Sequence, residues 1–293
     1  MYALLSPQRH NACMSLHRHL QDLWTRLPQQ QGVLVLVHRT LGSVPREAGT
    51  WMVVWPDGHL TGTIGGGQLE YQAMERAQAL LSGLPDAPPG GEEHRYPLGP
   101  SLGQCCGGVV FLRFEIIDAS QIDALRQRLQ AALPPVAIFG GGHVGEALVS
   151  LLSTLPCNLH WIDSRDSVFP DTTPAHVRTE HSEPVQGAVA GLAPQSRVLI
   201  MSFSHAEDLD ILIACVQRQR QAGDLPYIGL IGSKTKWAKF RHRLQARGFS
   251  DAEIAHVTCP IGLPDISGKE PEVIAVAVAA QLLQQGLLAS SRD

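Results

Sequence analysis

The stretch that decides the fold is Val136-Ala-Ile-Phe-Gly-Gly-Gly-His-Val-Gly145, in which an apolar run leads directly into closely spaced glycines. Gly140, Gly142 and Gly145 have the spacing GxGxxG, which is typical of a strand-to-helix turn that binds a dinucleotide. The first glycine permits a sharp turn, the second lets a diphosphate approach the backbone, and the third lets the helix pack on the sheet. The pattern therefore predicts a strand, a phosphate-binding turn and a helix.

A carboxylate stands where such a turn would require one. The next apolar run, Asn158-Leu-His-Trp-Ile-Asp163, ends in Asp163, and an acidic residue about 20 residues after the glycines commonly binds a ribose hydroxyl. We therefore interpret Asp163 as a cofactor-binding residue. The alternative is that the glycines serve only tight packing between strand and helix.

The second half of the chain, which contains the glycine turn, continues with the same alternation of strand and helix. Strands predicted at 136–139, 159–162, 198–201 and 227–231 alternate with helices predicted at 144–153, 206–219 and 234–247. This alternation predicts a parallel sheet with helices on both faces and a ligand at the carboxyl edge of the strands. At that edge Lys234 begins a helix, where it is either a phosphate contact or a solvated lysine.

The first half is organised differently. Helical spacing over 14–27 and an apolar face of Leu69, Ala73, Ala77 and Leu80 are mixed with strand-like runs at 33–37, 50–55, 60–64 and 109–117. Residues 82–93, rich in proline and glycine, are predicted to form an exposed loop. The chain is thus predicted to be α/β: a mixed α+β domain over 1–118, a linker over 119–135, and a Rossmann-like parallel-sheet domain with a C-terminal helix over 136–293.

Two glycine-rich segments of the first half are hard to explain as scaffold. They are Gly42-Ser-Val-Pro-Arg-Glu-Ala-Gly49 and Thr61-Gly-Thr-Ile-Gly-Gly-Gly-Gln-Leu-Glu70. The triplet Gly65, Gly66 and Gly67 indicates close approach of the backbone to a ligand or to another chain segment. Arg46 has the chemistry for a bidentate phosphate contact, and an ion pair with Glu70 or Glu47 is its alternative.

Adjacent cysteines stand in a third glycine-rich segment, Gly103-Gln-Cys-Cys-Gly-Gly108. Thiolates suit soft metals and sulfur chemistry, so Cys105 and Cys106 are candidate contacts of a ligand atom. The alternative is that one of the two is a small buried apolar residue.

Composition excludes several classes of function. With 23 Lys and Arg against 27 Asp and Glu, no basic surplus exists to bind nucleic acid. The chain has no apolar run long enough for a membrane span, so we expect a cytoplasmic protein. The six cysteines show no repeated CxxC spacing, and no metal-ligand set or catalytic set is evident.

Taken together, these motifs resemble the XdhC/CoxI family. The resemblance covers nearly the whole chain in the same order, and it is carried by GSVPREAGTWMVV, GTIGGGQLE, the CCGG loop, GGGHVG, WIDSR, YIGLIGSKTKWAKF and CPIGLPDISGKEPEVIAVAVAAQLL. It implies a chaperone that holds the molybdenum cofactor, molybdopterin, during sulfuration by a cysteine desulfurase and delivers it to xanthine dehydrogenase. It also implies a homodimer, in keeping with the frequency of dimers among oligomers.

One loop departs from the family pattern, since Ser202-Phe203-Ser204-His205 stands where the resemblance leads us to expect Thr-His-Ser-His. An NAD(P)-dependent oxidoreductase with His205 as general acid is the alternative function. A protein-interaction module is a third reading, which leaves the glycine segments unexplained. The sequence leaves open whether the Rossmann domain binds a nucleotide or the phosphate of the cofactor.

Overall fold

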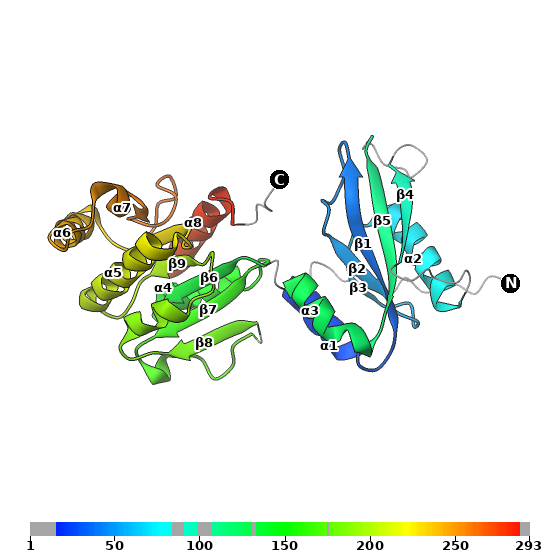
Figure 1. The fold of residues 1–293 in the computed structure, drawn as a ribbon, viewed down its shortest axis with the longest axis horizontal. Helices are drawn as coiled ribbons and strands as arrows, with labels where there is room; N and C mark the ends of the chain where they lie inside the picture. Colours follow the sequence, from blue (N-terminus) through cyan, green and yellow to red (C-terminus); the bar gives the residue numbers. More distant parts are fainter. Residues whose placement is uncertain (1–15, 84–90, 99–106, 131–132, 175, 288–293) are drawn as a thin grey trace. The chain divides into compact units, whose positions relative to one another are not determined.

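Residues 16–83, 91–98, 107–130, 133–174 and 176–287 are described by the structure, which is a computed structural model. The chain forms two compact units, Met1–Gln130 and Ala131–Asp293 (Figure 1). Each unit has its own sheet and its own buried apolar core. Cys105 and Cys106 lie outside the described residues.

The N-terminal unit is built on an antiparallel sheet with the strand order β3-β2-β1-β5-β4. Its strands are β1 (Gly32–Leu41), β2 (Trp51–Val54), β3 (Leu60–Gly62), β4 (Glu92–Pro97) and β5 (Val109–Ile117). The first six residues of the central strand β1 form a continuous apolar run that is almost entirely buried, because helices cover this part of the sheet, whereas most of the last four residues are exposed. Strand β4 begins within the segment that we predicted to be a loop, and it is a polar edge strand with alternating exposure.

Helices cover this sheet on both faces. They are α1 (Leu16–Arg26), α2 (Gly67–Leu81) and α3 (Ile122–Gln130). On α2 the four apolar residues predicted from their spacing are all buried. Helices α1 and α3 lie side by side away from α2 (Figure 1), with the Arg126 guanidinium over the Trp24 ring. Helix α3 occupies much of the segment expected to be a linker, and the first unit ends with it, at Gln130.

The C-terminal unit has a parallel sheet with the order β11-β10-β9-β6-β7-β8, which confirms the Rossmann-like prediction. Its strands are β6 (Pro135–Phe139), β7 (Asn158–Asp163), β8 (Val177–His181), β9 (Arg197–Ile200), β10 (Tyr227–Leu230) and β11 (Val257–Thr258). The strand order reverses between β6 and β9. In such sheets the ligand crevice lies outside the carboxyl ends of those two strands.

Helices pack on both faces of this sheet, as Figure 1 shows. They are α4 (His143–Leu152), α5 (His205–Ala222), α6 (Lys234–Gln245), α7 (Asp251–Ala255) and α8 (Pro271–Gln284). Along β6 the buried residues alternate between the two cores: Val136 and Ile138 face one, whereas Ala137 and Phe139 face the other. Within the described residues no helix is long and apolar enough to cross a membrane.

Candidate functional site

The glycine turn of the C-terminal unit is shaped by two packing constraints and one open position. Gly140 has φ +130°, and a Cβ atom there would lie 2.1 Å from the Met201 carbonyl oxygen at the end of β9. A Cβ atom on Gly145 would lie 1.9 Å from the Gly140 carbonyl oxygen. A Cβ atom on Gly142 would meet nothing within 4 Å. The first and third glycines are therefore required by packing, whereas the second faces open space.

Gly142 is also the N-cap of α4, and its position provides no side-chain cap for the helix. The amides of the first turn of a helix have no intrahelical acceptor and lie at the positive end of the helix dipole. Open space and uncapped amides at the carboxyl end of β6 are suited to a phosphate group.

Asp163 holds this turn in place. Its side chain is 1% exposed, and Oδ2 accepts hydrogen bonds from the Gly141 amide at 2.6 Å and from Arg165 Nη2 at 2.9 Å. Oδ1 accepts from the Arg165 amide at 2.8 Å and from Arg165 Nε at 2.9 Å. A carboxylate has about four lone-pair sites, and these four bonds occupy them. In this arrangement Asp163 has no acceptor left for a ribose hydroxyl.

These bonds also determine the charge of the pair. Burial by itself raises the pKa of Asp163, but the hydrogen bonds from Arg165 and Gly141 outweigh it and lower the pKa below its usual value. The same contact raises the pKa of Arg165. Both groups are therefore ionised at neutral pH.

An aromatic side chain continues this cluster towards solvent. The Arg165 guanidinium stacks 4.7 Å from the ring centroid of Phe203, which follows β9 and is 68% exposed. Sequence reasoning singled out neither residue as a contact. Arg165 was visible two positions after Asp163, but its stacking on a residue 38 positions later depends on the fold.

A buried ion pair connects the next loops along the same edge. Lys236 Nζ lies 2.5 Å from Asp208 Oδ2 and donates to the Ile231 carbonyl, while Asp208 Oδ1 accepts from the amide and hydroxyl of Ser202. The lysine that takes part in this network is therefore Lys236. Lys234, which we considered as a phosphate contact, and His205, the candidate general acid, are exposed first residues of their helices.

In the N-terminal unit three segments predicted from sequence meet at one end of the sheet. A Cβ atom on Gly65 would lie 3.1 Å from Pro45 Cγ and 3.4 Å from Arg46 Cγ. A Cβ atom on Gly108 would lie 2.2 Å from the Ser43 carbonyl oxygen. The Arg46 segment is thus packed between the glycine triplet and the last residue of the cysteine segment.

The triplet Gly65, Gly66 and Gly67 has positive φ at all three positions, and the carboxylate of Glu70 holds it. Glu70 Oε1 accepts from the amides of Ile64 and Gly66, both at 2.9 Å. Glu70 is therefore part of the turn, and Arg46 pairs neither with it nor with Glu47. Arg46 is exposed beside the uncapped start of α2 and forms no ion pair with any described residue.

The cysteines that the structure describes are poor candidates for a soft ligand. Burial raises the pKa of the Cys157 and Cys215 thiols to about 12 and that of Cys259 to about 11. These thiols are therefore protonated at neutral pH. No group of three or more potential metal ligands occurs among the described residues.

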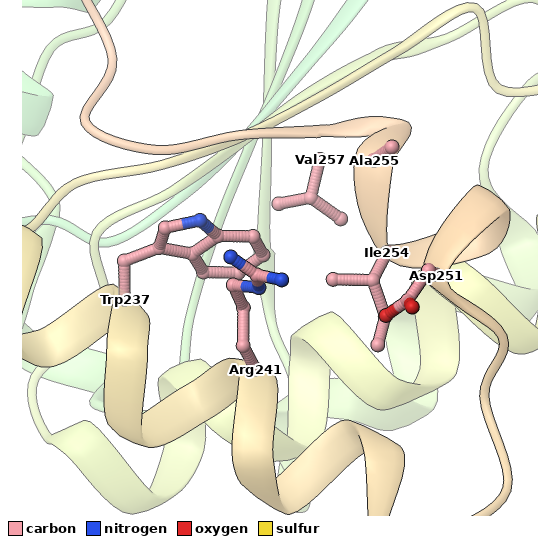
Figure 2. Close-up of a pocket in the computed structure, with 6 residues that line it drawn as sticks. All are labelled: Trp237, Arg241, Asp251, Ile254, Ala255 and Val257. Carbon is pink, nitrogen blue, oxygen red and sulfur yellow. The ribbon is translucent and has the colours of Figure 1, made fainter.

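A cavity of about 210 Å³ lies elsewhere in the C-terminal unit (Figure 2). Trp237 and Arg241 of α6 line one side, and Asp251 and Ile254 of α7 line the other. Val257, which also lines it, begins β11, so the cavity lies near the amino end of a parallel strand. The glycine turn lies at the carboxyl end of the sheet, so the cavity belongs to a different edge.

Comparison with known families gives two matches. Residues 136–282 match the XdhC Rossmann domain, and residues 26–86 match the XdhC and CoxI family. Together the two matches take in the glycine turn, Asp163, the Arg46 segment and the glycine triplet.

Individual proteins are also similar to this chain. The uncharacterized protein YqeB of Escherichia coli K12 is 26% identical over 245 residues, which are 83% of this chain and 41% of YqeB. The chain thus spans about two fifths of the length of that relative. A crystal structure described as a xanthine dehydrogenase from Bacillus halodurans superposes with a TM-score of 0.73 at 20% identity, covering 95% of this chain and 97% of the other. That similarity shows a shared fold.

Proposed function

Because the chain belongs to the XdhC and CoxI family, we propose that it is an accessory protein that binds the molybdenum cofactor as cargo. It holds the cofactor while a cysteine desulfurase supplies the terminal sulfur, and it then delivers the cofactor to xanthine dehydrogenase. The protein acts on its partners as a homodimer and has no catalytic turnover of its own.

One observation carries the proposal: the Arg46 segment, the glycine triplet and the end of the cysteine segment converge at one end of the N-terminal sheet. Molybdopterin carries a phosphate, a pterin and a dithiolene. Arg46 and the uncapped amides of α2 suit the phosphate, because a guanidinium and a helix N-terminus both attract anions. Within the turn the Gly65 amide donates to Thr63 and the Gly66 amide donates to Glu70, so the backbone groups that the triplet offers to the edge of the pterin are the Gly67 amide and the carbonyls.

The cysteine pair completes this assignment on chemical grounds. Cys105 and Cys106 lie outside the described residues, but Gly108, two residues after Cys106, is next to the Arg46 segment. A thiolate there would be a soft ligand near the dithiolene and its metal. We expect Cys105→Ser and Cys106→Ser to reduce the molybdenum retained by the purified protein without lowering its melting temperature. Retention at the parental level in both variants would remove the thiols from the proposal.

The delivery role is tested by reconstitution. Cofactor-free xanthine dehydrogenase is mixed with molybdenum cofactor, a sulfur donor and this protein, and its activity is compared with the mixture that lacks the protein. The proposal expects activation that scales with the amount of protein added, and no oxidation of NAD(P)H by the isolated chain. Steady NAD(P)H turnover by the chain alone, without activation of the acceptor, would favour the oxidoreductase alternative instead.

A further inference from the structure

Helix α6 and the turn after it carry a dense group of positive charges. Residues 234–247 contain three lysines and three arginines, whereas residues 225–250 contain no Asp or Glu, in a chain with a net charge of −4. Four of these cations are exposed on the later part of α6 and just after it, and we call them the basic patch: Lys239, Arg241, Arg243 and Arg247. None of the four forms an ion pair with a described residue.

The stability of α6 does not explain this patch. Cations in the last turn of a helix interact favourably with its dipole, which accounts for Arg243. Lys239 and Arg243, however, are four residues apart in α6, and like charges at that spacing destabilise a helix. A carboxylate at either position would have stabilised it instead. The pattern therefore favours an anionic partner from outside the helix.

The basic patch borders the cavity of about 210 Å³ between α6 and α7 (Figure 2). Arg241 belongs to both, and Trp237, one turn earlier on the same face of α6, forms the adjoining wall. Ile254 and Val257 line the cavity and belong to the buried apolar core, whereas Ala255, which also lines it, is exposed. An apolar hollow that opens to solvent thus lies directly beside the positive charges.

The volume limits what this cavity can hold. Sites for cofactors and other small molecules usually measure about 300–1,000 Å³, so the cavity is smaller than such sites. It is several times larger than the volume of about 30 Å³ that one water occupies in the liquid, and its apolar walls give water few hydrogen bonds. One apolar side chain from another protein fits these limits, and anchors of this kind commonly form the centre of a protein interface.

We propose that the basic patch and this cavity together form a docking surface for an acidic segment of another protein. One apolar side chain of the segment fills the cavity, and neighbouring carboxylates pair with the patch. Opposite charges steer such partners together and set their register. The inference goes beyond the cargo role, because it concerns a protein partner and does not depend on which residues hold the cofactor.

Two carboxylates of α7 lie near the patch, and both have other partners. Asp251 lines the cavity and accepts a hydrogen bond from Gln245 Nε2 at 3.0 Å. Glu253 is paired with Arg220. Both lie in the first turn of α7, where negative charge stabilises the helix. The one carboxylate at the cavity is outnumbered by the four cations of the patch, so the surface remains positive.

The cavity also favours a protein over a nucleic acid as the partner. A phosphate backbone would use the four cations, but it has no aliphatic side chain for the apolar walls. A chain with a net charge of −4 also has no general attraction for a polyanion. A protein segment uses the charges and the cavity together.

Fluorescence anisotropy of the full chain with labelled peptides tests the inference. The first peptide has one leucine among glutamates, the second has serine in place of the leucine, and the third has lysines in place of the glutamates. We expect the first to bind, the second to bind about tenfold more weakly because the leucine is no longer buried, and the third not to bind. Added salt should weaken binding of the first peptide, because it screens exposed charges.

Three variants separate the charges from the cavity. Arg241→Glu reverses one charge of the patch and should weaken binding of the first peptide by about tenfold. Ala255→Leu fills the cavity from an exposed position, and it should lower the affinity for the first peptide to that for the second. Lys269→Glu is the matched control: Lys269 is exposed between β11 and α8 and has no ion pair with a described residue, so this variant should bind like the parent.

The inference is overturned if the first peptide does not bind, if the serine peptide binds equally well, or if Arg241→Glu and Lys269→Glu bind alike. A single-stranded RNA that bound more tightly than the first peptide would also overturn it, because the patch would then be a nucleic-acid surface. None of these measurements involves molybdenum, so failure here is distinct from failure of the cargo role.

Discussion

Both units of the molecule contain a glycine turn that leads into a helix and is held by a carboxylate. The two turns differ in whether that carboxylate also binds the nearby arginine. In the C-terminal unit Asp163 comes from the neighbouring strand, is buried, and binds both the Gly141 amide and the Arg165 side chain. In the N-terminal unit Glu70 comes from the first turn of the helix itself and binds only the turn. Arg46 therefore keeps its hydrogen-bonding edge for another anion.

This difference gives the arginine beside each glycine turn a different chemical role. An arginine that is locked by a buried carboxylate is a rigid, flat surface, suited to stacking. An exposed arginine beside an uncapped helix start has a positive charge that no carboxylate neutralises, and it is suited to binding a phosphate. The comparison thus distinguishes an arginine held by a carboxylate in one unit from an arginine without an ion pair to a described residue in the other.

The largest effect is expected where the backbone leaves no room. Gly145→Ala places a Cβ atom against the Gly140 carbonyl oxygen, so the C-terminal unit should lose more than about 3 kcal/mol of unfolding free energy, beyond the usual cost of an overpacked side chain. Gly142→Ala meets no neighbour and should stay within about 0.5 kcal/mol of the parent. Hydrogen exchange measured by mass spectrometry reports the two units separately, and equal losses in both variants would contradict the geometry of the turn.

A smaller effect distinguishes the two carboxylates. Both oxygens of Asp163 accept hydrogen bonds, so in Asp163→Asn the NH₂ group of the amide must face donors on one side. We therefore expect the unfolding free energy to fall by about 2 kcal/mol. In Glu70→Gln the amide oxygen can replace Oε1, which accepts all the bonds from the turn, so the loss should be less than about 1 kcal/mol. Denaturation of the two variants under the same conditions measures whether Asp163→Asn loses more unfolding free energy than Glu70→Gln.

The Asp163 effect should also depend on pH. The pKa of Asp163 is lowered in the folded protein, so its ionised form contributes stability that is complete above the unfolded value of about 3.9. That contribution is lost as the pH falls through the lower folded pKa. The difference in stability between the parent and Asp163→Asn should therefore be constant from about pH 5 to pH 7 and should shrink below about pH 4. A difference that grew on acidification would show that the group is not held as a carboxylate.

Much of this fold was predictable because its signals are local. The strands at β6, β7, β9 and β10 are short apolar runs that end in glycine, serine or aspartate, and their spacing predicted the Rossmann-like unit. Strand β8 was missed because one of its residues, Val177, is buried while the others carry polar groups. Strand β4 was missed for the same reason, since an edge strand needs few apolar residues.

The sites were predictable to a lesser extent. Glycine spacing identified both turns, because positive φ and close packing require glycine whatever the rest of the fold does. The sequence suggested a ribose contact for Asp163, which stays a prediction, but it could not reveal that Arg165 occupies the same oxygens. It likewise offered Glu70 as a partner of Arg46, whereas the structure uses Glu70 to hold the triplet. Partners at short range along the chain depend on side-chain directions that spacing alone does not determine.

The smallest effect on stability is expected at Arg46, together with a large effect on binding. Arg46 is exposed and has no ion pair among the described residues, so Arg46→Ala should change the unfolding free energy by less than about 0.5 kcal/mol. If the side chain binds the phosphate of the molybdenum cofactor, its loss should reduce affinity about tenfold or more, as for other hydrogen bonds between charged groups. Arg95 of β4 is similarly exposed in the same unit, so Arg95→Ala controls for the general loss of one positive charge. Retained molybdenum, measured by mass spectrometry after gel filtration, should fall in the Arg46 variant alone. Equal retention in the two variants would show that the phosphate binds elsewhere. Arg46 would then lack the phosphate-binding role by which we distinguish it from Arg165.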